Sequence, residues 1–203
     1  MSTIPSTDPG GTGGPSNVLL LAGRRDEREA TACGELAGPT APQRAHLLLV
    51  TGIASPWDRL TSWADAVGGR PPETTVVDVS TTTRSAVTAD PAAVSVAGPT
   101  DWSDVTIETV DDDLLTLGQR VTNVLSGTNR QPVVCVDSVS DLLQSTNREC
   151  VFRFLEVLTR DVERSGAVAH YHLDPDIHDP ETVSTVEVLF DAVLDLREDG
   201  HAH

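Results

Sequence analysis

Lysine is missing from this sequence: all 14 basic residues are arginines, against 31 Asp and Glu. The 203-residue chain therefore carries a formal net charge of −17. Nonspecific binding to nucleic acid or to anionic membranes needs clustered cations, so this composition argues against both partners.

Long apolar runs and cysteine frameworks are missing too. No run approaches the roughly 20 residues of a membrane span, and the N-terminus lacks the charged and apolar regions of a signal peptide. The three cysteines (Cys33, Cys135 and Cys150) are scattered, with no C-x-x-C pair. The sequence therefore predicts no disulfide framework and no zinc ribbon, in a soluble and reduced protein. Cys135 lies inside an apolar run and is expected to be a small core residue.

The acid-rich, lysine-free composition is similar to that of cytoplasmic proteins of salt-in halophiles. High salt screens repulsion between carboxylates, because the Debye length falls to about 3 Å at 1 M. We therefore expect a cytoplasmic protein of a halophilic archaeon that needs salt to fold.

The most informative stretch that is present runs from Pro132 to Asp137, followed by Ser138. Its four consecutive apolar residues predict a strand buried on both faces of a parallel sheet, with Asp137 at the carboxyl end. In open α/β sheets that end is where ligands bind. Asp137 is then either a metal-binding aspartate of the Walker B type or the cap of the next segment.

Strand and helix patterns alternate along the rest of the chain. Apolar runs predict further strands, and apolar residues at helical spacing, with Pro or acidic residues at the start, predict helices. The predicted strands are 17–23, 46–51, 74–79, 167–173 and 190–196, and the predicted helices lie within 24–37 and at 56–67, 111–125, 148–164 and 180–188. Residues 80–107 give no clear pattern beyond short edge strands or a hairpin.

This order predicts an α/β fold: three layers, with a mostly parallel sheet and helices on both faces. Residues 17–197 form the single domain. Residues 1–16, rich in Gly, Pro, Ser and Thr, are expected to be disordered, and residues 198–203 form a polar tail.

With these elements in place, the chain resembles the RecA/KaiC-like P-loop ATPases over roughly residues 17–197. Residues 133–143 closely resemble the Walker B strand of KaiC with its D-S-L-S continuation. The run ending at Gly23 stands where the strand before the phosphate loop would be. The resemblance implies that fold, and it implies association with a protein partner or with further copies of the chain.

The phosphate loop itself is degenerate. A P-loop reads G-x-x-x-x-G-K-[ST], with a flexible loop, a cation on the phosphates and a hydroxyl on Mg²⁺. Counting from Gly23, those last three positions hold Arg28, Glu29 and Ala30. The resemblance therefore implies a noncatalytic member, a pseudo-ATPase with a regulatory, signalling or assembly role and without a required cofactor.

Two alternatives remain open. Arg24, Arg25 and Arg28, with Gly23 and Asp137, could form a substitute nucleotide site at a helix N-terminus, or a solvated and charge-balanced turn.

The other alternative concerns His170 and His172, which alternate on a strand and so face one side. With Asp174 they could bind a divalent metal. The simpler interpretation is a histidine pair at a sheet edge, followed by an Asp-Pro turn. A metal-dependent hydrolase or atypical ATPase using Asp137 with these histidines is accordingly the second hypothesis of function.

Overall fold

The computed structural model describes residues 14–23, 26, 28–36, 42–52, 55–80, 105–111 and 113–197. Its sheet contains the strands β1 (Asn17–Leu21), β2 (Ala45–Thr51), β3 (Glu73–Ser80), β4 (Thr106–Asp111), β5 (Gln131–Asp137), β6 (Val168–Leu173) and β7 (Ala192–Asp195). The helices are α1 (Arg28–Leu36), α2 (Pro56–Val67), α3 (Leu114–Gly127), α4 (Val139–Ser145), α5 (Arg148–Ser165) and α6 (Pro180–Glu187). Short 3₁₀ turns occupy Pro42–Arg44 and Pro175–Ile177.

The seven strands pair in the order β4-β3-β2-β5-β6-β1-β7. Every adjacent pair is parallel. The α/β prediction is thus confirmed, and the sheet is more uniformly parallel than expected. The strand that ends at Asp137 is central, and one strand, β6, separates it from β1.

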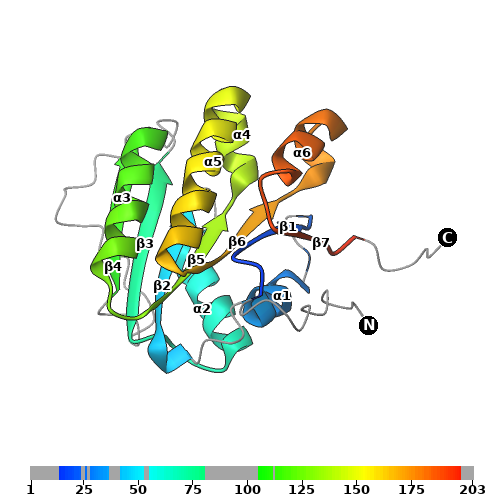
Figure 1. Ribbon diagram of the computed structural model, residues 1–203. Helices are drawn as coiled ribbons and strands as arrows, with labels where there is room; N and C mark the ends of the chain where they lie inside the picture. The colour runs from blue at the N-terminus through cyan, green and yellow to red at the C-terminus, as the bar shows by residue number, and fades with distance from the viewer. Residues whose placement is uncertain are drawn as a thin grey trace, which may run out of the picture.

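Helices cover both faces of the sheet (Figure 1). One core packs α3, α4, α5 and α6 against alternate residues of the strands, among them Leu19, Val134 and Tyr171. The second core packs α1 and α2 against the intervening residues, such as Leu20 and Cys135. Because successive strand residues point to opposite faces, each central strand contributes to both cores.

Local sequence signals explain where the helices begin and end. α2 begins with Pro56 after Ser55 and ends at Gly68, whose φ of 75° is the left-handed region that glycine adopts without a Cβ penalty. The side chains of Asp113 and Asn147 cap α3 and α5. These caps accept hydrogen bonds from the free N–H groups of the first turn.

Three details differ from the sequence prediction. β4 only overlaps the end of the segment 80–107 in which edge strands were expected, and the short helix α4 was not predicted, because an edge strand and a two-turn helix are stabilised mainly by packing. β7 begins at Ala192, two residues later than expected. β6 lies inside the sheet, between β5 and β1, so the histidine pair is not at a sheet edge. Most of the segment expected to be disordered, and the tail at 198–203, lie outside the described residues.

In the part of the chain that the structure describes, no helix combines the length and apolarity needed to cross a bilayer.

Candidate functional site: a buried ionic network on the α1–α2 face

Three elements, β5, β6 and α1, each contribute two side chains to one cluster between α1 and the sheet. On β5 and β6 the two residues are separated by two positions and therefore face the same side of the sheet. On α1 they are separated by four positions and therefore share one face of the helix. The pairs are Cys135 with Asp137 on β5, His170 with His172 on β6, and Glu29 with Cys33 on α1.

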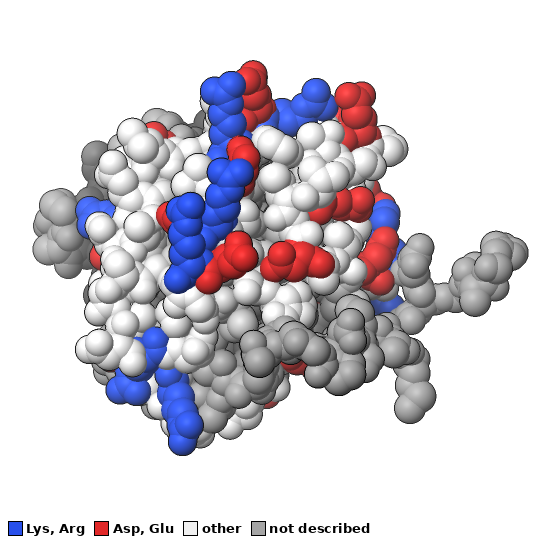
Figure 2. Space-filling view, in the orientation of Figure 1, with Lys and Arg blue, Asp and Glu red and all other residues white. Residues whose placement is uncertain are grey.

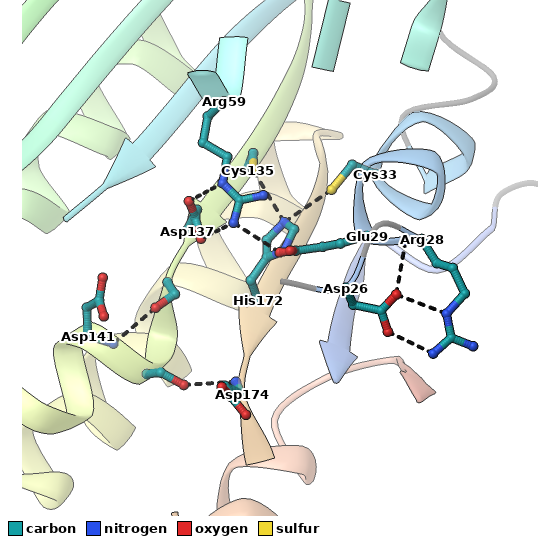
Figure 3. Close-up of polar contacts among 12 residues, drawn as sticks. Asp26, Arg28, Glu29, Cys33, Arg59, Cys135, Asp137, Asp141, His172 and Asp174 are labelled. Carbon is teal, nitrogen blue, oxygen red and sulfur yellow. Dashed lines mark hydrogen bonds and ion pairs between the residues drawn. The ribbon is translucent and has the colours of Figure 1, made fainter. Parts of the chain in front are cut away.

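Arg59, from α2, joins two of these carboxylates (Figure 3). Its Nε and Nη2 donate to the two oxygens of Asp137 at 2.5 and 2.9 Å, which is a bidentate pair. Nη2 also donates to Oε1 of Glu29 at 3.1 Å. The same Glu29 oxygen is hydrogen-bonded to Nδ1 of His172. One connected network therefore runs from Asp137 through Arg59 and Glu29 to His172.

The network is largely withdrawn from water. The side chains of Asp137, Glu29 and His172 are 6%, 9% and 4% exposed, and that of Arg59 is 23% exposed. Burying charges costs free energy unless they are paired and hydrogen-bonded. Here each charged group faces a partner of opposite sign, which is the condition under which buried ions are tolerated.

The pKa values follow from this pairing. Burial alone would raise the pKa of Glu29, but the hydrogen bonds and charges of His172 and Arg59 outweigh it and hold the pKa below its usual value. Burial alone would lower the pKa of His172, but contacts with Cys135 and Glu29 raise it. The pKa of Arg59 is raised as well, since Asp137 and Glu29 outweigh the effect of burial. Glu29 is thus a carboxylate and Arg59 a cation in the folded protein.

The residues expected to form a nucleotide site are only partly brought together. Asp137 is in the network, whereas Arg28 lies outside it and pairs with Asp26, its Nη2 being 2.7 Å from Oδ2. The backbone oxygen of Gly23 accepts from the N–H of Asp26 at 2.9 Å, in the turn that leads into α1. Arg24 and Arg25 lie outside the described residues.

The expected metal ligands are also separated. His170 and His172 lie together, with ring centroids 5.3 Å apart. Asp174 instead begins the following 3₁₀ turn, where its Oδ1 accepts from the N–H of Asp176 at 3.1 Å. Among the described residues, two groups bring potential ligand atoms within 4.8 Å of one another: Cys33, His170 and His172, and Glu29, Asp137 and His172.

Sequence reasoning missed Glu29, Cys33, Cys135 and Arg59 as members of this cluster. Glu29 was noted only as the residue standing in place of the P-loop lysine. The i, i+4 spacing of Glu29 and Cys33 could have marked one face of α1. Which strands lie under that face depends on the order of strands in the sheet, and spacing along the chain does not contain that order.

The fold and this network define an α/β protein with an all-parallel sheet and a closed ionic cluster beside the carboxyl end of its central strand. Within that class the chain belongs to the family of unknown function DUF7504, whose model matches residues 15–196. No curated protein matches the chain.

A solved structure from Pyrococcus horikoshii OT3, titled a structural study of project PH0250, has a similar fold. The two sequences are 11% identical, the TM-score is 0.54, and the likeness covers 92% of this chain and 83% of that one. At this level of identity the likeness shows the fold alone.

Proposed function

We propose that this protein is a noncatalytic domain of the RecA/KaiC-like type, a pseudo-ATPase that acts through contacts with other protein chains. The observation that carries the proposal is the position of Arg59, which holds both Asp137 and Glu29. By resemblance, Asp137 stands in place of the Walker B aspartate and Glu29 in place of the P-loop lysine. The positions that would bind Mg²⁺ and phosphate are therefore both held by the same arginine.

The energetics favour this closed arrangement. For Mg²⁺ to reach Asp137, it would have to displace a bidentate guanidinium that is already paired with this carboxylate and with Glu29. A phosphate would meet the carboxylate of Glu29, although phosphoryl transfer depends on positioning and on stabilisation of negative charge. At about 4 Å and an effective dielectric of about 20, replacing an attraction by a repulsion changes the interaction by up to about 8 kcal/mol.

Calorimetry with ATP and Mg²⁺ in multimolar KCl, followed by a phosphate-release assay, tests the proposal. We expect no turnover above background and at most weak binding. Asp137→Ala and Asp195→Ala form a matched pair, because Asp195 also ends a strand and is held by an arginine, with its Oδ2 2.7 Å from Nη2 of Arg197. Micromolar binding that only Asp137→Ala abolishes would overturn the noncatalytic assignment.

The alternative is a metal-dependent hydrolase or atypical ATPase centred on Asp137. It is favoured by the grouping of ligand atoms from Glu29, Asp137 and His172 within 4.8 Å. Arg59 already donates hydrogen bonds to both carboxylates of that group, so a metal ion would have to compete with this arginine for their oxygens. Metal-dependent turnover in the same assay would select this alternative.

An assembly role needs a surface, and the groove between α3 and α5 provides one. The groove has a volume of about 540 Å³, and its lining includes Leu115, Phe154 and Val157. Leu115 and Val157 are 69% and 56% exposed. Uncharged side chains cover the region of α3, and basic and acidic side chains alternate along α5 (Figure 2). An exposed apolar hollow of this kind typically marks a contact site.

Charge indicates a second copy of this chain as the occupant. α3 and α5 together contain five Arg and four acidic residues, a net charge of +1, whereas the whole chain carries −17. Two acidic molecules repel each other least where they present such a balanced face. The rim bears both Arg153 and Asp161, so two copies related by a two-fold axis can place opposite charges across the contact.

Sedimentation velocity in multimolar KCl tests this contact. We expect a concentration-dependent dimer that Val157→Glu converts to monomer. Val188→Glu is the matched control, because Val188 is also an exposed valine, at 76%, but lies at the end of α6, outside the groove. A wild-type protein that stays monomeric at high concentration, or a dimer that both variants retain, contradicts the assignment of this face.

A further inference from the structure

Two thiols and two imidazoles converge at the His172 end of the ionic network, and His172 belongs to both groups. The Sγ atoms of Cys33 and Cys135 lie 3.3 and 3.5 Å from the same atom, Nε2 of His172. Ligand atoms of Cys33, His170 and His172 all lie within 4.8 Å of one another. Cys135 and His170 are register partners on the neighbouring strands β5 and β6. All four side chains are buried.

The separations suit a tetrahedral metal ion. With Zn–N near 2.0–2.1 Å and Zn–S near 2.3 Å, the edges of a tetrahedral site measure about 3.3 to 3.8 Å. The two sulfur–nitrogen distances to His172 already fall in that range. The ligand atoms of Cys33, His170 and His172 lie within 4.8 Å of one another, and Cys135 joins this group through its contact with Nε2 of His172, so closing the tetrahedron requires the side chains to draw together around the ion. Two cysteines and two histidines are a usual set for structural zinc.

The hydrogen bonding of the two histidines also favours a metal site. Nδ1 of His172 is bonded to Glu29, so its Nε2 is the nitrogen aimed at the two sulfurs. A carboxylate on the far ring nitrogen is the arrangement that orients metal-binding histidines. Nε2 of His170 is buried and has no hydrogen-bond partner in the part of the chain that the structure describes. A buried polar atom without a partner is costly, and a metal ion would satisfy the ring.

Space and charge also permit an ion. A cavity of about 20 Å³ adjoins the cluster on the side of the thiols: its lining includes Cys33, Cys135 and Arg59 but neither histidine. Two thiolates would neutralise a divalent cation. The charge of Arg59 is already balanced by Asp137 and Glu29, so this arginine does not oppose the ion.

We propose that Cys33, Cys135, His170 and His172 bind one Zn²⁺ ion that fastens α1 to strands β5 and β6. Four protein ligands leave no open coordination position, so the site is structural rather than catalytic. Binding displaces the two thiol protons, and the proton on Nε2 of His172 where that ring is protonated, to solvent. It also ties the ion to the folded state, because the ligands come from three separate elements. The proposal does not depend on whether the protein binds nucleotide.

Metal analysis and cobalt substitution test the site on the full chain, purified with a phosphine reductant in multimolar KCl. We expect one Zn²⁺ per chain by mass spectrometry of the metal content. Replacing it with Co²⁺ should give the intense visible bands of a tetrahedral ion and a thiolate charge-transfer band. Folded wild-type protein that takes up neither Zn²⁺ nor Co²⁺ at these ligands overturns the proposal.

Variants distinguish Zn²⁺ binding at these four ligands from adventitious binding elsewhere on the chain. His170→Gln removes a ligand whose Nε2 has no protein partner, so we expect a folded chain with greatly weakened Zn²⁺ affinity in competition with a chromogenic chelator. Cys150→Ser is the matched control, because Cys150 is a free thiol exposed on α5, far from the cluster in the fold. Equal loss of affinity in both variants, or in neither, contradicts the assignment.

Glu29→Gln probes the positioning of His172. We expect Zn²⁺ affinity to fall about 10–100-fold, the usual effect of removing a carboxylate behind a ligating histidine. If Glu29 only stabilises the fold, the substitution should instead lower the melting temperature and leave the Zn²⁺ affinity unchanged. In the wild-type protein a strong chelator should lower the melting temperature, and it should not do so in Cys33→Ser.

Discussion

At the scale of single residues, Arg59 determines what the cluster can do. It is the one described cation in contact with both Asp137 and Glu29, at 2.5 and 3.1 Å. Without it, two buried carboxylates would face each other with only His172 to balance them. The guanidinium therefore acts as an internal counter-ion for both buried carboxylates.

Replacement of Arg59 by Met should destabilise the fold by about 2–4 kcal/mol, because it leaves two buried carboxylates without their cation. The lower part of the usual range is expected, since Arg59 is 23% exposed. Urea unfolding followed by circular dichroism in multimolar KCl measures the change.

Arg160→Met is the control for that measurement. Arg160 also touches a carboxylate, with Nη2 2.7 Å from Glu156, but its side chain is 59% exposed. Such surface pairs contribute about 0–1 kcal/mol. If both substitutions cost the same, the network contributes no more than an ordinary surface pair, and Arg59 is not the counter-ion that keeps the two carboxylates buried.

At the scale of elements, the cluster depends on how closely α1 packs against α2. Gly34 makes that approach possible, because a Cβ built on it would lie 2.8 Å from Cβ of Ala66 and 3.0 Å from its backbone carbon and oxygen. Glu29 and Cys33 lie on the same helix and Arg59 on the next. Any shift of α1 away from α2 would therefore pull the network apart.

Gly34→Ala should consequently destabilise the protein by about 1–3 kcal/mol, the usual cost of overpacking against backbone. Gly118→Ala on α3 is the matched substitution, because its added Cβ would meet only Phe154, at an ordinary 3.7 Å. There the better helix propensity of alanine should stabilise by up to about 1 kcal/mol. Thermal melts of both variants give the comparison, and a neutral Gly34→Ala would show that α1 can move freely.

At the scale of the whole molecule, the excess of negative charge determines how stability depends on salt. Even if each of the 14 arginines neutralised one carboxylate, 17 of the 31 acidic residues would remain without a cation. Repulsion among them acts over about 10 Å at 0.1 M salt and about 3 Å at 1 M. Folding brings these charges closer together, so low salt raises the free energy of the folded state more than that of the unfolded chain.

We therefore expect the melting temperature to rise steeply between low and multimolar KCl. Circular dichroism melts in KCl and in K₂SO₄ at equal ionic strength separate two causes. Screening alone gives equal midpoints, whereas a higher midpoint in sulfate indicates strengthened burial of apolar surface. A midpoint that does not change with KCl would contradict the salt requirement inferred from the composition.

The sequence by itself determined the class of fold. Short runs such as Val133–Val136 can be buried on both faces only within a parallel sheet covered by helices, so they fix strand positions and the carboxyl-terminal place of Asp137. The composition likewise determined the charge of the molecule.

Only the tertiary structure decided the partners within the site. Spacing showed that His170 and His172 share a face, but not that β6 lies inside the sheet, beside the strand of Cys135. Glu29 and Cys33 meet them across more than 130 residues, and Arg59 joins from a different helix. Such contacts are set by strand order and by the packing of α1 on the sheet. Strand order and helix packing depend on the apolar surface buried over the whole core, and no local pattern in the sequence predicts that sum.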